Sequence, residues 1–218
     1  MKNYIISLLL FAISLSLYSQ QTMDFVYLFD DFLKGSAVQK TGAISSGLFN
    51  YELASGKIHF MDHDTALELA YPESMLYIKI GDRIFEHVKG NLFYEKVNTG
   101  SIYLYIYHQG QIISKGKSTG YGSRTQTSSV ESINMIPSGG TIVRINVDEL
   151  FEVKKKDSYF LKVNGKFKRF TSFNSLAKLF KGHEKEIENG LKNENLSFNN
   201  LDDITKAVSY CSQFATDK

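Results

Sequence analysis

The chain has no tryptophan, one cysteine and only two prolines among its 218 residues. The single cysteine, Cys211, excludes an intrachain disulfide, and a chain of this length can bury a sufficient core without one. Because the prolines are confined to Pro72 and Pro137, no proline-rich linker divides the chain. The length suits one domain, with or without an appendage.

Neither sign of charge is in excess. The chain has 25 Lys and Arg residues against 23 Asp and Glu residues, which gives a formal net charge of +2. Proteins that bind nucleic acid typically carry a strongly basic patch or stripe. The composition therefore predicts no nucleic-acid partner.

Long hydrophobic runs are missing everywhere except at the N-terminus. Lys2 precedes an apolar run over residues 5–17, and small and polar residues follow at 18–21. This order is typical of a cleaved secretory signal peptide, and the run is shorter than the roughly 20 residues of a membrane span. We predict that residues 1–20 are a signal peptide; a first core helix is the alternative.

Export follows from that prediction. The mature protein is expected in the periplasm or outside the cell, with no transmembrane segment after signal cleavage. Because the removed segment contains Lys2 and no acid, the formal charge of the mature chain falls from +2 to +1.

Short β-branched and aromatic segments separated by turn residues recur from residue 47 to residue 170. Glycine at the turns suits the positive φ of tight hairpins, and Asn164-Gly165 is the clearest hairpin signal. Residues 75–115 leave no room for helical crossovers, so the strands are expected to be antiparallel. We also expect turns at Gln109-Gly110 and at 154–157, and a strand within 23–34, where a helical pattern fits as well.

The hydrophobic period changes after residue 171. Ser172 can cap a first short helix, residues 183–192 form a charged second one, and Asn199 or Asn200 can cap a third. The sequence thus predicts an α+β fold, a predominantly antiparallel β meander, open or curled, with two or three C-terminal helices packed on it. The expected parts are a β domain over 21–170 and a helical segment over 171–218.

The strongest strand signal is the segment 101–108 (SIYLYIYH). Side chains alternate between the faces of a strand, so Ile102, Leu104 and Ile106 share one face, which is predicted to lie in the core. Tyr103, Tyr105 and Tyr107 share the other face. Tyrosine offers apolar area and a hydroxyl, so these three are the candidate ligand-binding residues. The alternative is that they pack beneath the C-terminal helices.

Three sequence patterns could carry chemistry. Residues 116–120 (GKSTG) match the nucleophile pattern around Ser118, but no helix follows, and the glycine-rich stretch before it has the wrong spacing for a phosphate-binding loop. His59 and His63 lie close to Asp62 and Asp64, which are suitable metal-ligand types, but a single strand would not make them converge. We therefore predict no catalytic residue, no metal site and no cofactor.

Four segments together resemble small exported proteins of Bacteroidota with no assigned function. The segments are 48–51 (LFNY), 83–85 (RIF), 114–117 (SKGK) and 210–213 (YCSQ). The resemblance implies a secreted, β-rich protein and adds no mechanism or site residue.

The function expected from the sequence is a non-enzymatic binding or interaction module of the periplasm or cell surface. Its partner would be an unknown protein. The first alternative is a carrier that holds a small apolar ligand in a curled sheet. The second is a hydrolase that uses Ser118 or the His59/His63 cluster.

Overall fold

The computed structural model describes residues 26–117 and 149–215. The strands are β1 (Leu33–Gln39), β2 (Ile44–Tyr51), β3 (Ile58–Asp62), β4 (Thr65–Glu68), β5 (Met75–Ile80), β6 (Arg83–Lys89), β7 (Leu92–Asn98), β8 (Tyr103–Tyr107), β9 (Gly110–Lys117), β10 (Glu149–Lys155), β11 (Ser158–Val163) and β12 (Lys166–Phe170). The helices are α2 (Phe173–Ala177), α3 (Glu184–Asn193) and α4 (Leu201–Cys211), with short 3₁₀ turns at Pro72–Ser74 and Ser212–Phe214.

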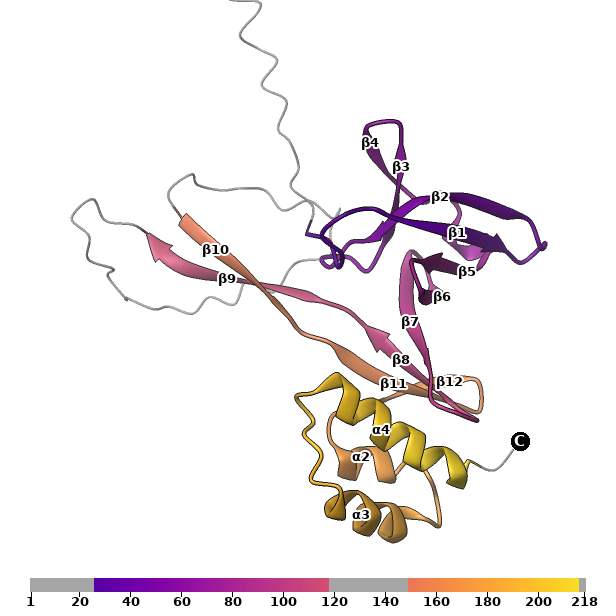
Figure 1. The fold of residues 1–218 in the computed structure, drawn as a ribbon, viewed down its shortest axis with the longest axis vertical. Coiled ribbons are helices and arrows are strands. Elements are labelled where there is room, and N and C mark those ends of the chain that lie inside the picture. Colours follow the sequence, from indigo (N-terminus) through magenta and orange to yellow (C-terminus); the bar gives the residue numbers. More distant parts are fainter. Residues whose placement is uncertain (1–25, 118–148, 216–218) are drawn as a thin grey trace, which may run out of the picture.

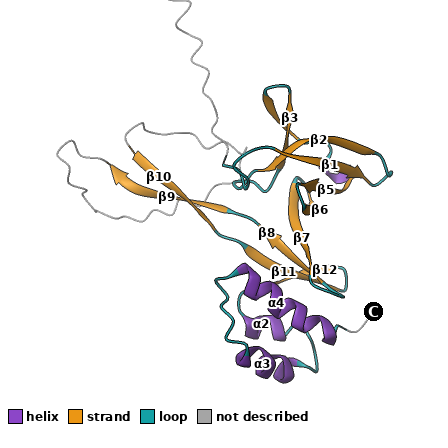
Figure 2. Ribbon diagram, viewed as in Figure 1, coloured by secondary structure: helices purple, strands orange, loops and turns teal. Residues whose placement is uncertain are grey.

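Ten strands form one antiparallel sheet in the order β12-β11-β8-β7-β6-β5-β1-β2-β3-β4, and β9 and β10 form a two-stranded ribbon. The ribbon continues from β8 and β11 and extends away from the rest of the molecule (Figure 1). The three helices lie together at one end, beside β8, β11 and β12 (Figure 2). The predicted fold class, an antiparallel α+β protein with C-terminal helices, is confirmed.

One face of the sheet, which we call the inner face, carries both hydrophobic cores. Over β1, β2, β5, β6 and the start of β7, the core contains Phe49, Tyr51, Ile78, Phe85 and Phe93. Over β8, β11 and β12, a second core contains Leu104, Ile106, Leu161 and Phe170 together with the buried side chains of the helices. The strong twist of the sheet turns the same face towards two separate cores.

The loop after β2 closes the first core. The Leu53 carbonyl accepts a hydrogen bond from the Gly110 amide at 3.1 Å, and the Gly56 carbonyl accepts one from the Phe93 amide at 3.3 Å. Gly56 has φ +73° and lies so close to Leu92 and Tyr107 that a Cβ atom there would be 2.7 Å from each. Only glycine fits this backbone conformation at such a close approach.

Helices α2 and α4 begin where capping side chains predict. The Ser172 hydroxyl accepts a hydrogen bond from the Ser175 amide, and the Asn200 side chain accepts from the Asp202 and Asp203 amides. Helix α4 buries Ile204, Ala207, Val208 and Cys211 on the stripe that faces the sheet. These helices cover the Ile102, Leu104 and Ile106 face of β8, as expected for the core side of that strand.

Three local predictions were wrong. Residues 26–32 form only an isolated bridge, Tyr27 to Glu52, so the strand expected within 23–34 begins at Leu33. No hairpin turn lies at Gln109-Gly110 or at 154–157, because β8 pairs with β7 and β11 while β9 pairs with β10. At both positions the chain continues from one strand into the next without reversing direction, because each strand pairs with a segment that is distant in the sequence. Residues 141–147, whose sequence also predicts a strand, lie outside the described residues.

Candidate functional site

The three tyrosines of β8 lie on the face of the sheet opposite the helices, which we call the outer face. The helices pack on Leu104 and Ile106, whose side chains alternate with those of Tyr103, Tyr105 and Tyr107. The alternative that the tyrosines pack beneath the C-terminal helices is therefore wrong. The helical stripe fits the smaller aliphatic side of β8, and the tyrosines are left for a second layer.

The second layer is an aromatic cluster built across four strands. Tyr94 of β7 stacks on Phe160 of β11 at a ring separation of 4.9 Å and lies 5.4 Å from Tyr107. Phe167 of β12 meets the ring of Tyr105 edge-on at 4.9 Å. Tyr105 is only 3% exposed as a result. The two phenylalanines, both half-buried, thus form the outer surface above the tyrosines.

Tyr103 is the most open of the three tyrosines, at 43% exposure. The Lys96 ammonium lies 4.2 Å from the centre of its ring. A cation over an aromatic face is attracted by the negative face of the ring, which favours this placement of Lys96. The pair places a cation beside a partly exposed aromatic ring at the surface.

Glu86 is the acidic residue at the centre of this surface. Its carboxylate accepts hydrogen bonds from Lys96 and Lys162, each at 3.0 Å, and from the Tyr105 hydroxyl at 3.2 Å. Burial favours its neutral form, but the two lysines outweigh that effect and lower the pKa of Glu86. Burial and the neighbouring Glu86 raise the pKa of Tyr105, which keeps its hydroxyl protonated as a donor.

The register of the sheet continues this surface in a row across the strands. Lys79 is opposite Ile84, Ile84 is opposite Lys96, Lys96 is opposite Tyr105, Tyr105 is opposite Phe160, and Phe160 is opposite Arg169. Side chains directly opposite in neighbouring strands share a face and contact each other. The row therefore alternates cations with apolar and aromatic side chains from β5 to β12.

Basic residues outnumber acidic ones on the outer face. Among the described strands β1, β5, β6, β7, β8, β11 and β12, its basic residues are Lys34, Lys79, Lys96, Lys162 and Arg169, and its acidic residue is Glu86. We call these five the outer-face cations. Neighbouring strands are about 4.8 Å apart, so Lys79 and Lys96 are separated by roughly 10 Å and Lys96 and Arg169 by roughly 14 Å. Such a surface suits a ligand with separated negative charges.

A second cluster of charged side chains lies on the inner face, between the two cores. His108 Nδ1 lies 2.9 Å from a carboxylate oxygen of Asp157, and its Nε2 lies 2.7 Å from a carboxylate oxygen of Glu95. Arg83 binds the Glu95 carboxylate with two nitrogens, Nε at 2.6 Å and Nη2, and its Nη2 lies 2.8 Å from His108 Nε2. We call these four residues the buried charge cluster.

Protonation of His108 balances the buried charge cluster. Burial opposes the charged imidazole, but the hydrogen bonds and charges of Asp157 and Glu95 outweigh burial and raise the pKa of His108. Burial also opposes ionisation of Glu95, but His108 and Arg83 lower its pKa. Both imidazole nitrogens contact carboxylates, and His108 is only 2% exposed. This imidazole therefore connects residues of different strands within the interior of the protein.

The sequence-predicted histidines do not form a metal site. His59 is buried, with Nδ1 2.9 Å from the Tyr27 hydroxyl, and burial lowers its pKa. His63 is exposed in the β3–β4 turn, at φ 53°, where it contacts Asp62. In the described part of the chain, no group of three or more His, Cys, Asp or Glu side chains could hold a metal ion. Ser118 lies outside the described residues.

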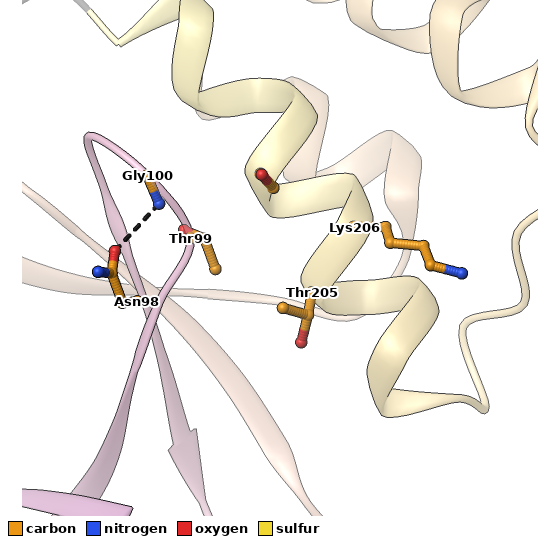
Figure 3. A pocket seen from close by; sticks show the side chains of 6 residues that line it. Asn98, Thr99, Gly100, Thr205 and Lys206 are labelled. Carbon is orange, nitrogen blue, oxygen red and sulfur yellow. Dashed lines mark hydrogen bonds between the residues drawn. The ribbon is translucent and has the colours of Figure 1, made fainter.

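The carrier hypothesis needs an apolar cavity beside the tyrosines. Figure 3 shows one surface pocket, between the β7–β8 turn and helix α4, which is lined by Asn98, Thr99, Gly100, Thr205, Lys206 and Ser209. A second pocket lies between α2 and α3 and is lined by Phe173, Asn174, Glu188, Leu191, Lys192, Asn195 and Leu196. Neither pocket includes any of the three tyrosines, which face the aromatic cluster instead.

Sequence reasoning found the tyrosines and missed their neighbours. Lys96, Lys162 and Glu86 belong to strands that were predicted, but nothing in the sequence tells which strands are adjacent. The order β7-β8-β11-β12 brings residues more than 60 positions apart onto one surface. The available signal was alternation: in 159–170, residues Phe160, Lys162, Phe167 and Arg169 fall on one face of the predicted hairpin.

Comparisons with protein-family models, with curated proteins and with solved structures found no match. Among the described residues, no helix has both the length and the apolar character that a membrane span requires.

Proposed function

We propose that the chain is an exported, non-enzymatic binding module whose outer face binds an acidic segment of another protein. The observation that carries the proposal is the composition of that face over β1, β5, β6, β7, β8, β11 and β12, with five cations, one carboxylate and partly exposed aromatic rings between them. The signal-like residues 1–20 support export, which places the partner in the periplasm or at the cell surface.

The partner's charge follows from the imbalance on the outer face. Glu86 engages both Lys96 and Lys162, so one carboxylate is shared by two cations. Lys79 and Arg169 are exposed at the two ends of the same row. Carboxylates of a partner would pair with these cations, and such charge complementarity favours fast and specific association.

An acidic polypeptide fits the outer face better than an acidic polysaccharide does. A sugar platform needs flat, open aromatic rings, whereas Tyr94 and Tyr105 are covered by Phe160 and Phe167, and Lys96 already lies over Tyr103. An extended peptide that advances about 3.1 Å per residue brings every third side chain to one side, about 9 Å apart. That repeat is close to the separation of Lys79 and Lys96.

The test measures binding of a short peptide with Glu at every third position and Tyr and Ala between. A triple variant, Lys79→Gln, Lys96→Gln and Arg169→Gln, is expected to weaken binding about tenfold or more, since each exposed pair contributes up to about 1 kcal/mol. The matched control removes three exposed lysines of the helical segment, Lys178→Gln, Lys185→Gln and Lys206→Gln. It has the same net charge and is expected to bind like the wild type.

Competing ligands separate the proposal from its rivals. Tighter binding of polygalacturonate or of a single-stranded oligonucleotide than of the acidic peptide would contradict it. Equal losses in the two triple variants would also contradict it, because they would indicate attraction by net charge alone.

A further inference from the structure

The buried charge cluster lies where the two-stranded ribbon β9–β10, which we call the arm, joins the main sheet. His108 lies between β8 and β9, and Asp157 lies between β10 and β11. The ladder of the main sheet ends at Ser158 opposite Tyr107, and that of the arm ends at Lys155 opposite Gly110. Within the interruption, the Lys156 amide donates to the Gln109 carbonyl at 2.7 Å.

We propose that the buried charge cluster is a proton-operated joint, in which the imidazolium of His108 holds the arm against the body and loss of its proton releases the arm. The inference is independent of the proposed function. His108 ties both strands of the arm to the sheet, because Nδ1 contacts Asp157 on one strand and Nε2 contacts Glu95 of β7. Arg83 of β6 fixes Glu95 in turn.

Each protonation state of His108 supports a different set of contacts. The imidazolium donates to both carboxylates, and with Arg83 the four side chains carry two positive and two negative charges. The neutral imidazole keeps one N–H, so it can donate to Asp157 and accept from Arg83, but Glu95 then loses a donor. The neutral state leaves one excess negative charge in a buried site, which is unfavourable.

Tyrosine, glutamate and lysine side chains also lie near the joint. The Tyr51 ring lies 5.9 Å from His108, and its hydroxyl donates to the His108 carbonyl at 3.3 Å. Burial raises the pKa of Tyr51 and of Tyr107, so both stay neutral while His108 titrates. Glu52, close to Tyr51, uses its carboxylate to bind the Ala54 and Ser55 amides. Lys155 donates to the Leu28 carbonyl at 3.4 Å.

Three contacts between the body and the base of the arm do not involve the imidazole, so they remain when His108 loses its proton. They are the hydrogen bonds from the Gly110 amide to the Leu53 carbonyl, from Lys155 to the Leu28 carbonyl and from the Tyr51 hydroxyl to the His108 carbonyl. All three lie at the base of the arm, so they hold it to the body while allowing its angle to change. Release is therefore expected to be a change of orientation and not an unfolding of the sheet.

The test measures a distance distribution between spin labels at Lys154→Cys on the arm and Lys79→Cys on β5, two exposed positions. Cys211 is buried, and burial raises the pKa of its thiol to about 12, so it resists labelling, which mass spectrometry checks. The imidazole resonances of His108 are followed by NMR over the same pH range. The distribution is expected to be narrow while His108 is protonated and to broaden at the midpoint of its titration.

Two variants test whether the broadening of the distance distribution depends on the protonation of His108. Asp157→Asn removes one carboxylate, so both the His108 midpoint and the broadening are expected to move about one pH unit lower. The control His183→Gln, at an exposed histidine before α3, is expected to leave both unchanged. A distribution that stays constant through the His108 titration would overturn the proposal, as would a His108 that shows no titration below pH 10.

Discussion

His108 Nε2 lies 2.7 Å from Glu95 Oε2, and both side chains are almost entirely removed from water. The contact joins the end of β8 to the middle of β7, at the boundary between the core under the helices and the core of β1–β7. A buried ion pair of this kind costs desolvation, and it is favourable only when every charge has a partner. Here Arg83 and Asp157 supply the remaining partners.

Glu95→Gln is expected to lower the free energy of unfolding by about 3 kcal/mol, because Arg83 and the His108 imidazolium lose the carboxylate they share. Urea unfolding at pH 7 measures the change. The control Glu186→Gln, on the exposed side of α3, is expected to stay within about 0.5 kcal/mol of the wild type. Similar losses for the two variants would argue against the cluster as a structural element.

The stability of the fold is expected to depend on pH through the same cluster. Because the pKa of His108 is raised in the folded state, its contribution is complete below about 6.5 and is lost as pH rises through the folded-state pKa. Because the pKa of Glu95 is lowered, its contribution is complete above about 4.5 and is lost as pH falls through the folded-state pKa. The free-energy difference between wild type and His108→Gln should thus be largest at pH 4.5–6.5 and shrink on the alkaline side. Urea unfolding across pH measures it, and a difference that grows with rising pH would have the wrong sign.

Gly56→Ala is expected to be strongly destabilising, by about 2–3 kcal/mol, because the added methyl group would overlap Leu92 and Tyr107 in a backbone conformation that already disfavours side chains. Gly90→Ala is the matched control, since Gly90 also has positive φ (+52°) but no atom within 4 Å of an added Cβ. It is expected to cost about 1 kcal/mol. Thermal unfolding compares the two, and equal losses would exclude close packing as the reason for glycine at position 56.

Asn200→Ala is expected to destabilise the protein by about 1 kcal/mol, because the Asp202 and Asp203 amides at the start of α4 lose their side-chain acceptor. The neighbouring variant Asn199→Ala leaves that cap in place and should change the free energy of unfolding by less than about 0.5 kcal/mol. Chemical denaturation measures both. A larger loss for Asn199→Ala would move the cap one residue earlier.

Local sequence patterns were sufficient to predict most of the secondary structure. Asn164-Gly165, Ser172 and Asn200 act through their own backbone or the next turn, so their roles do not depend on distant residues. The same holds for the two faces of β8. The expected turns at Gln109-Gly110 and 154–157 were wrong because pairing between β8 and β11 joins segments about 55 residues apart, which turn residues do not encode.

The candidate site was less predictable because it depends on strand order. The sequence indicated that Tyr103, Tyr105 and Tyr107 share a face, but not that Lys96, Phe160 and Phe167 surround them. In the sequence, His108 is the last residue of the strand segment 101–108. Its partners could not be predicted, since Glu95 and Asp157 are 13 and 49 residues away. Overall net charge also hid the outer-face cations, because acidic residues elsewhere balance them.

The central claim is that the outer face binds an acidic polypeptide. Its most direct test is NMR mapping of amide and aromatic resonances during titration with the peptide that has Glu at every third position. We expect shifts at Lys79, Lys96, Tyr103, Phe160 and Arg169, with little change in α3 and α4, and a weaker response as salt is added. Shifts confined to the helices, or none at a peptide concentration that saturates binding, would contradict the account.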